Sequence, residues 1–158
     1  MNAPAVPPYL ANEDTLDTFL AAFHDGTYPI KEWTHGAHVV MATAVLWTHP
    51  MPVALDITRS AIRHYNEAQG GQNTATSGYH ETLTRLWLAA VAGYLASLPP
   101  SCARVDAARM AWHQFSNRRM LFKEWYSYDL VTSVQARATW QPPDRPRHLV
   151  ESLRPDAP

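Results

Sequence analysis

The sequence predicts an all-α protein, a single-domain bundle of five or six mostly antiparallel helices. Apolar residues recur at helical spacing along most of the chain, and no stretch of useful length alternates in the manner of a strand. The connections between most of the apolar segments are short, which favours antiparallel neighbours. The chain has 158 residues, the size of one domain. A chain of that length buries roughly 70% of the surface that it exposes when unfolded.

Prolines are concentrated at both ends of the chain, at positions 4, 7 and 8 and again from position 142 onward. Proline fixes the backbone and removes a hydrogen-bond donor, so these ends do not continue as helices. We therefore expect an extended proline-rich arm over residues 1–12 and a proline-rich tail over residues 141–158. The helical domain is expected between them, over residues 13–140.

The first three helices follow from apolar spacing and from their end signals. A helix is expected over residues 13–24, where Asp25-Gly26 ends the apolar run. The second, over residues 35–48, begins after Thr34, a good N-cap. It is apolar almost all round, which predicts a central position in the bundle. The third runs from Pro52, a favourable first helical residue, to about position 67.

The second half of the chain begins with a long polar loop over residues 66–78, a candidate lid over a binding site. Ser77 is then expected to cap a fourth helix over residues 78–98. A fifth helix starts near position 101. After a less regular aromatic segment, Ser127 is expected to cap a short helix over residues 128–138.

Composition argues against several classes of function. The formal net charge is −1 with no block of like charge, so neither nucleic acid nor an anionic membrane is an expected partner. The N-terminus does not read as a signal peptide, and no apolar run reaches the ~18 residues of a membrane span. The single cysteine, Cys102, suits a reducing compartment. We expect a cytoplasmic protein whose partner is a small molecule, and a homo-oligomer stays open.

Three histidines at helix starts are the most informative feature of the sequence. His35 and His38 are three residues apart, so they share a helix face that continues into the apolar core. His80 lies on the same stripe as Thr84 and Trp87 of the fourth expected helix. Each of the three could instead be a hydrogen-bonded core residue, and a lone His-x-x-His pair is a weak signal.

Three imidazoles that leave an open position form the ligand set of a catalytic metal site. Imidazole suits a divalent transition metal, with zinc or iron expected first and copper or nickel as further options. The positive end of a helix works against a bound cation. It also favours the neutral imidazole that a metal requires, and an anion in the open position.

Other polar residues near these stretches are candidates for catalysis and substrate binding. Glu81, Tyr79 and Tyr126 are expected to move a proton. Glu81 could equally pair with Arg85, and Thr84 could either bind substrate or bond back to the backbone carbonyl of His80. Substrate binding is also expected from Arg137 on the last helix and from Asn73 in the loop. A cationic group in the aromatic segment, Arg118, Arg119 and Lys123, either clamps an anionic substrate or forms a solvated patch.

Parts of the sequence resemble a group of small bacterial proteins. That group carries an aromatic-x-His-x-x-His stretch followed some forty residues later by Tyr-His-x-Thr-x-Thr. The matching stretches here are Trp33-Thr34-His35-Gly36-Ala37-His38 and Tyr79-His80-Glu81-Thr82-Leu83-Thr84, with Ser133-Val134-Gln135-Ala136-Arg137 near the end. The likeness covers most of residues 20–145. It supplies candidate positions and no chemistry.

The first functional hypothesis is a small metal-dependent enzyme that acts on a polar, anionic small molecule, with the metal held by His35, His38 and His80. A second is a metal-free enzyme in which histidines at helix N-termini act as acid and base. A third is a non-catalytic module that binds a small ligand in an aromatic pocket.

Overall fold

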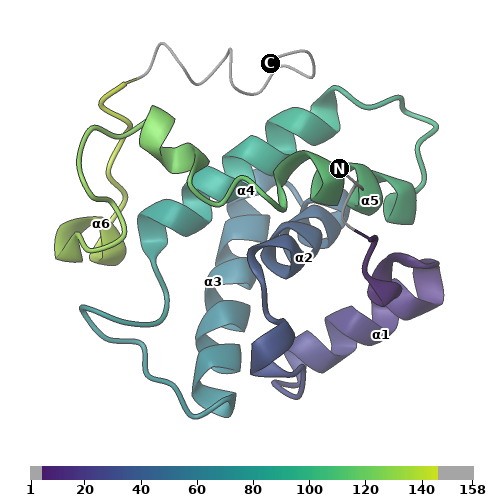
Figure 1. Ribbon diagram of the computed structural model, residues 1–158, viewed down its shortest axis with the longest axis horizontal. Coiled ribbons are helices and arrows are strands. Elements are labelled where there is room, and N and C mark those ends of the chain that lie inside the picture. Colours follow the sequence, from purple (N-terminus) through teal and green to yellow (C-terminus); the bar gives the residue numbers. More distant parts are fainter. Residues whose placement is uncertain (1–4, 146–158) are drawn as a thin grey trace.

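The computed structural model describes residues 5–145, and helices account for all of the regular structure in that range. The α-helices are α1 (Glu13–His24), α2 (His35–Thr48), α3 (Met51–Ala68), α4 (Glu81–Ala96), α5 (Arg104–Phe115) and α6 (Val134–Ala138). Short 3-10 turns are η1 (Pro8–Leu10), η2 (Ile30–Glu32) and η3 (Leu121–Glu124). Figure 1 shows the helices packed into one bundle, so the all-α, single-domain prediction is confirmed.

Helix α2 lies in the middle of the bundle, in contact with α3, α4 and α5 (Figure 1). Nine of its 14 residues are buried, which its apolar sequence predicted. The hydroxyl of Thr34 accepts a hydrogen bond from the backbone N–H of Ala37, at 3.3 Å, as expected of the N-cap. The start of α2 is therefore fixed both by packing and by its cap.

The core consists of two hydrophobic clusters that meet at α2. One contains Val39 and Ala42 of α2 together with residues of α4, α5 and the segment 121–136. The other contains Val40 and Met41 together with residues of η1, α1, α3 and α5. Consecutive residues of α2 therefore serve opposite sides of the molecule, which is the physical reason that this helix has no polar face.

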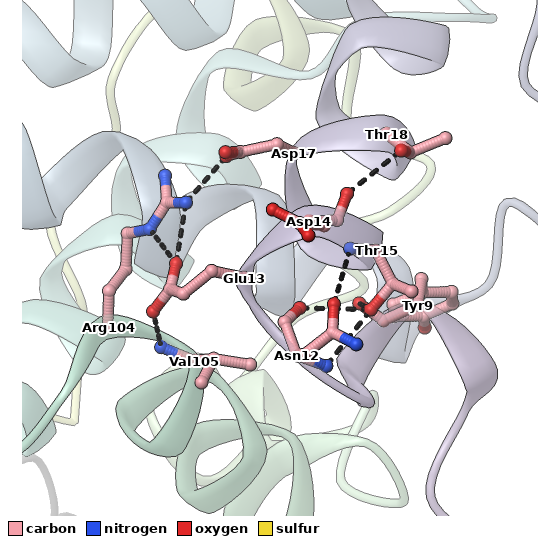
Figure 2. Close-up of polar contacts among 9 residues, drawn as sticks. All are labelled: Tyr9, Asn12, Glu13, Asp14, Thr15, Asp17, Thr18, Arg104 and Val105. Carbon is pink, nitrogen blue, oxygen red and sulfur yellow. Dashed lines mark hydrogen bonds and ion pairs between the residues drawn. The ribbon is translucent and has the colours of Figure 1, made fainter.

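A partly exposed ionic contact joins the first helix to the fifth, and Figure 2 shows its geometry. The Arg104 guanidinium lies 2.6 Å from the Glu13 carboxylate and 2.5 Å from that of Asp17. Glu13 also accepts the backbone N–H of Val105, at 2.9 Å. At the start of α1, Asn12 and Thr15 cap the helix through reciprocal side-chain and backbone hydrogen bonds (Figure 2). These contacts hold α1 against the N-terminus of α5.

The N-terminal segment differs from the expected extended arm. Residues 8–10 form a 3-10 turn, Leu10 is fully buried, and the ring of Tyr9 stacks on Phe19 with centroids 4.4 Å apart. Apolar side chains among the prolines explain this, because they complete the cluster around α1. The expected arm at residues 1–4 and the expected tail at residues 146–158 lie outside the described residues.

Two expected helix starts are wrong, and local hydrogen bonds explain both. Helix α4 begins at Glu81 with His80 as its N-cap, because the Ser77 hydroxyl bonds within the preceding loop instead. Helix α6 begins only at Val134 and is capped by Ser133. Before it, the carboxylate of Asp129 accepts hydrogen bonds from the backbone of Val131 and the hydroxyl of Thr132, a turn that competes with helix. Ser127, the expected cap, bonds to Asp144.

Within residues 5–145, none of the helices is long and apolar enough to cross a membrane.

Candidate functional site

A cavity of about 1080 Å³ lies among the first half of α2, one side of α3, residues 78–88 and the segment 119–132. Its size is that of a site for a small organic ligand. Three of the predicted site residues do not line it: Asn73, Glu81 and Arg137. The six that do are His35, His38, Tyr79, His80, Thr84 and Tyr126.

His35 lines the cavity and carries an unpaired, buried polar atom. Its Nε2 is buried and has no hydrogen-bond partner, while its ring packs edge-on against Trp87 with centroids 4.4 Å apart. Burial lowers the pKa of His35 to about 4, with smaller contributions from the charges of His38 and Arg119. A backbone hydrogen bond to Phe115 opposes this shift. His35 is therefore neutral at neutral pH.

His38 lies one helical turn further along the same face of α2. Its Nδ1 is 2.8 Å from the carbonyl oxygen of Thr34, so Nδ1 carries the proton and donates it to that carbonyl. Nε2 is left with its lone pair. The ring lies over Trp33 with centroids 4.0 Å apart, and burial lowers its pKa. The structure thus brings together two neutral imidazoles, as the i,i+3 spacing predicts.

His80 lines the same cavity but has a different role in the fold. Its Nδ1 accepts a hydrogen bond from the backbone N–H of Leu83, at 3.2 Å. Its Nε2 donates a hydrogen bond to the carbonyl oxygen of Leu130, at 2.9 Å. Both ring nitrogens are therefore engaged inside the chain, and burial lowers the pKa of this group. In this arrangement His80 has no lone pair left for a metal ion. Within residues 5–145, no three His, Cys, Asp or Glu side chains are grouped to hold one.

Glu81 is buried beside the cavity and belongs to an ion-pair network. Arg59 of α3 donates two hydrogen bonds to its carboxylate, at 2.8 and 3.1 Å, and the Tyr79 hydroxyl donates a third at 2.8 Å. These contacts lower the pKa of Glu81, while burial raises that of Tyr79 to about 12. Arg85, the partner suggested by the sequence, instead lies over the ring of Trp140. The carboxylate orients the Tyr79 hydroxyl at the cavity wall.

The other expected substrate-binding and catalytic residues are also held by neighbours. The Tyr126 hydroxyl donates to the carbonyl of Gln141 at 2.8 Å, and burial raises its pKa. Thr84 forms a side-chain hydrogen bond with Tyr79. Arg137 donates to three carbonyl oxygens, those of Gly78, Tyr79 and Val131, and so attaches α6 to the start of α4.

Asn73 organises the loop before α4. Its amide nitrogen donates to the carbonyl of Arg63 and to the carboxylate of Glu67. Its oxygen accepts from the side chain of Asn66 and from the backbone N–H of Tyr79, both at 3.0 Å. The loop is therefore fastened to α3 by one side chain, which lies outside the cavity lining.

Thr58 is a cavity residue that the sequence reasoning did not select. It is 1% exposed, its hydroxyl has no hydrogen-bond partner, and it lines the cavity from α3. The sequence does contain a pattern that could have identified it, because Thr58 is a polar residue on the same apolar helix face as Leu55 and Ile62. Of the expected basic clamp, Arg119 and Lys123 line the cavity and Arg118 does not.

Comparison of the chain with protein-family models, with curated proteins and with solved structures finds no significant match. The chemistry of the site is therefore argued from its own geometry.

Proposed function

We propose that the chain is a small enzyme, that the cavity is its active site, and that the His35–His38 pair is its acid–base group. The observation that supports this most directly is the buried, unpaired Nε2 of His35, a residue that lines a cavity large enough for an organic ligand. Leaving a buried polar atom without a partner costs about 1–3 kcal/mol. Such an atom is expected where a bound substrate completes the hydrogen bonding.

The two histidines divide the work between them. His38 is the base, because the Thr34 carbonyl holds the proton on Nδ1 and leaves the Nε2 lone pair to accept one from the substrate. The same carbonyl stabilises the imidazolium that forms, and the face of Trp33 adds a cation–π contact. The buried His35 stays neutral and accepts a hydrogen bond from the substrate through Nε2.

The test is turnover of a panel of carboxylic acids and phosphate esters, followed by proton NMR with the purified protein. We expect at least one compound to be converted by the wild type and not by His38→Ala. His64→Ala is the matched control, because His64 is exposed and does not line the cavity. If compounds bind and none is converted, the enzyme proposal is wrong and the chain is a ligand-binding module.

A second candidate is a metal site built on the same pair. It is favoured by one observation: His38 directs its ring N–H to a backbone carbonyl, the arrangement that orients histidine ligands in metal sites. His35 and His38 fit as two ligands, whereas His80 does not, since both of its nitrogens are engaged. A bound divalent metal would supply a Lewis acid beside the substrate.

The metal candidate is tested by titrating protein purified without a tag or chelator with Co²⁺ and Zn²⁺. The metal reading requires that His35→Ala and His38→Ala each abolish binding. His80→Ala is expected to lower stability by about 2–4 kcal/mol, because it leaves a cavity and removes partners of Leu83 and Leu130. It should leave any metal binding largely intact. Loss of metal with unchanged stability in His80→Ala would restore the three-histidine site.

A further inference from the structure

We infer that the cavity binds an organic anion with an apolar body, and that the acid group of this ligand lies beside Arg119, Lys123 and Arg145. The inference rests on the proposed function in one respect, that the cavity is the ligand site. It adds the chemical class of the ligand and the residues that select it.

Apolar groups dominate the walls that α2, α3 and α4 contribute. Met41, Ile62, Leu83 and Trp87 line the cavity from these helices, and Trp33 lines it from the turn before α2. Burying an apolar surface against such walls is favourable by roughly 25 cal/mol per Å². Two lining residues, His35 and Thr58, carry buried polar atoms without partners, so hydrogen bonds to the ligand body are expected at a few points only. A ligand without an apolar body would leave most of this surface in contact with water.

The charged residues of the cavity are concentrated on the C-terminal segment. Arg119, Lys123 and Arg145 line it, and among residues 5–145 the only carboxylate that lines it is that of Asp129. This gives an excess of two positive charges, three minus one, because the histidines in the cavity have lowered pKa values. Asp129 is occupied by its own turn, in which Thr132 donates to it at 2.8 Å.

The three cations lie outside the ion pairs that residues 5–145 form, although the charges of Lys123 and Arg145 help to lower the pKa values of Asp129 and Asp144. Among residues 5–145, no carboxylate forms an ion pair with Arg119, Lys123 or Arg145. Arg145 is positioned by hydrogen bonds to the backbone of Trp125 and Lys123, at 3.1 and 3.2 Å. Arg119 lines the same cavity as His35 and His38, and its charge makes a small contribution to the lowered pKa of His35. An acid group held beside these cations therefore lies in the same cavity as the histidine pair.

The experiment measures binding of four probes by isothermal titration calorimetry. The probes are 2-naphthoate, its neutral counterpart 2-naphthamide, decanoate and acetate. We expect the wild type to bind naphthoate at least about tenfold more tightly than naphthamide, the effect of roughly one charge-assisted hydrogen bond. Acetate, which has the charge and no apolar body, should bind far more weakly. Comparison of naphthoate with decanoate distinguishes an aromatic from an aliphatic body.

One variant removes two charges inside the cavity, and the control removes one charge outside it. Arg119→Gln and Lys123→Gln, combined, should bring naphthoate to the affinity of naphthamide while leaving naphthamide binding unchanged. Arg118→Gln removes a charge next to Arg119 that does not line the cavity, and should leave the difference intact. Equal affinity of the wild type for naphthoate and naphthamide would overturn the inference, as would equal binding of acetate and naphthoate or no binding of any probe. These measurements keep the histidines unchanged, so their failure is separate from a failure of turnover in the His38→Ala test.

Discussion

Three histidines with similar sequence surroundings have two different roles in the folded protein. His35 and His38 present an unused Nε2 in or beside the cavity, whereas His80 uses both of its nitrogens to join α4 to the segment around Leu130. The difference lies in the partners and not in the spacing. A histidine becomes available for chemistry only where the backbone supplies a partner for one of its nitrogens and leaves the other open.

At the residue scale, the first prediction concerns stability and pH. The folded-state pKa of His35, about 4, lies below its ordinary value of 6.5, and burial also lowers the pKa of His38 and His80. The unfolded chain therefore binds more protons, so the free energy of unfolding should fall as the pH drops from 6.5 toward 4. Above pH 6.5 this contribution is fully present.

Urea unfolding at a series of pH values measures this effect. His35→Gln should make the free energy of unfolding depend less steeply on pH between pH 6.5 and pH 4. The number of protons taken up on unfolding should fall by up to about one, because the substitution removes one of the groups that the unfolded chain protonates. Above that window its pH dependence should match that of the wild type. A wild type that is equally stable at both ends of the window would contradict the burial of these rings.

The second prediction separates two carboxylates that share one arginine. Arg59 pairs with Glu81, whose side chain is 11% exposed, and with Asp56, whose side chain is 76% exposed. Removing the charge of a buried partner leaves the other charge uncompensated, while an exposed pair contributes little. We expect Glu81→Gln to lower the free energy of unfolding by about 2 kcal/mol. Asp56→Asn should lower it by less than about 0.5 kcal/mol.

Thermal and urea unfolding near neutral pH provide the comparison. The unfolding free energy of Tyr79→Phe is a second test of the same network, because this substitution removes the hydroxyl that donates a hydrogen bond to Glu81. Similar costs for Glu81→Gln and Asp56→Asn would show that the network is not shielded from solvent.

At the element scale, the loop between α3 and α4 depends on one side chain. Asn73 makes four hydrogen bonds, and three of its partners, Arg63, Asn66 and Glu67, belong to α3. A loop over a site is expected to open more easily than the helices around it. Here the polar composition that suggested a lid also supplies the contacts that hold the loop closed.

Asn73→Ala should therefore speed cleavage of residues 69–80 by a broad-specificity protease in limited proteolysis. The free energy of opening the loop is expected to fall by about 0.5–1.5 kcal/mol, the net contribution of a typical hydrogen bond, since the bonds lost are exposed or only partly buried. Gln72→Ala is the control. The side chain of Gln72 is exposed, and the hydrogen bond that this residue accepts from Ser77 is to its backbone carbonyl, which the substitution keeps. Equal cleavage of the two variants would mean that the loop is held by packing alone.

At the scale of the whole molecule, the close approach of α2 and α5 joins the two hydrophobic clusters. Gly36 makes this approach possible: a Cβ at that position would lie 2.5 Å from the indole nitrogen of Trp112 and 3.2 Å from the Cβ of Ser116. The glycine is also in the first turn of α2, next to His35. The separation of these two helices therefore sets the position of the histidine pair.

Gly36→Ala should lower the free energy of unfolding by about 1–3 kcal/mol, because an extra methyl group forces two packed helices apart. Gly93→Ala, at an exposed position within α4, should instead raise it by roughly 0.5–1 kcal/mol through helix propensity. The opposite signs would be measured by thermal unfolding of the two variants. A stabilising Gly36→Ala would contradict the close packing of α2 against α5.

The sequence by itself determined the all-α fold class and the central place of α2, because apolar periodicity is a local property, whereas the starts of α4 and α6 depended on contacts elsewhere. It also placed His35 and His38 on one face, since residues three apart in a helix are neighbours. Only the tertiary structure decided which polar groups are left unpaired. The partner of His80 lies 50 residues away at Leu130, and that of Glu81 lies 22 residues away at Arg59. Contacts between distant segments follow from how the helices pack, and no local pattern in the sequence contains that information.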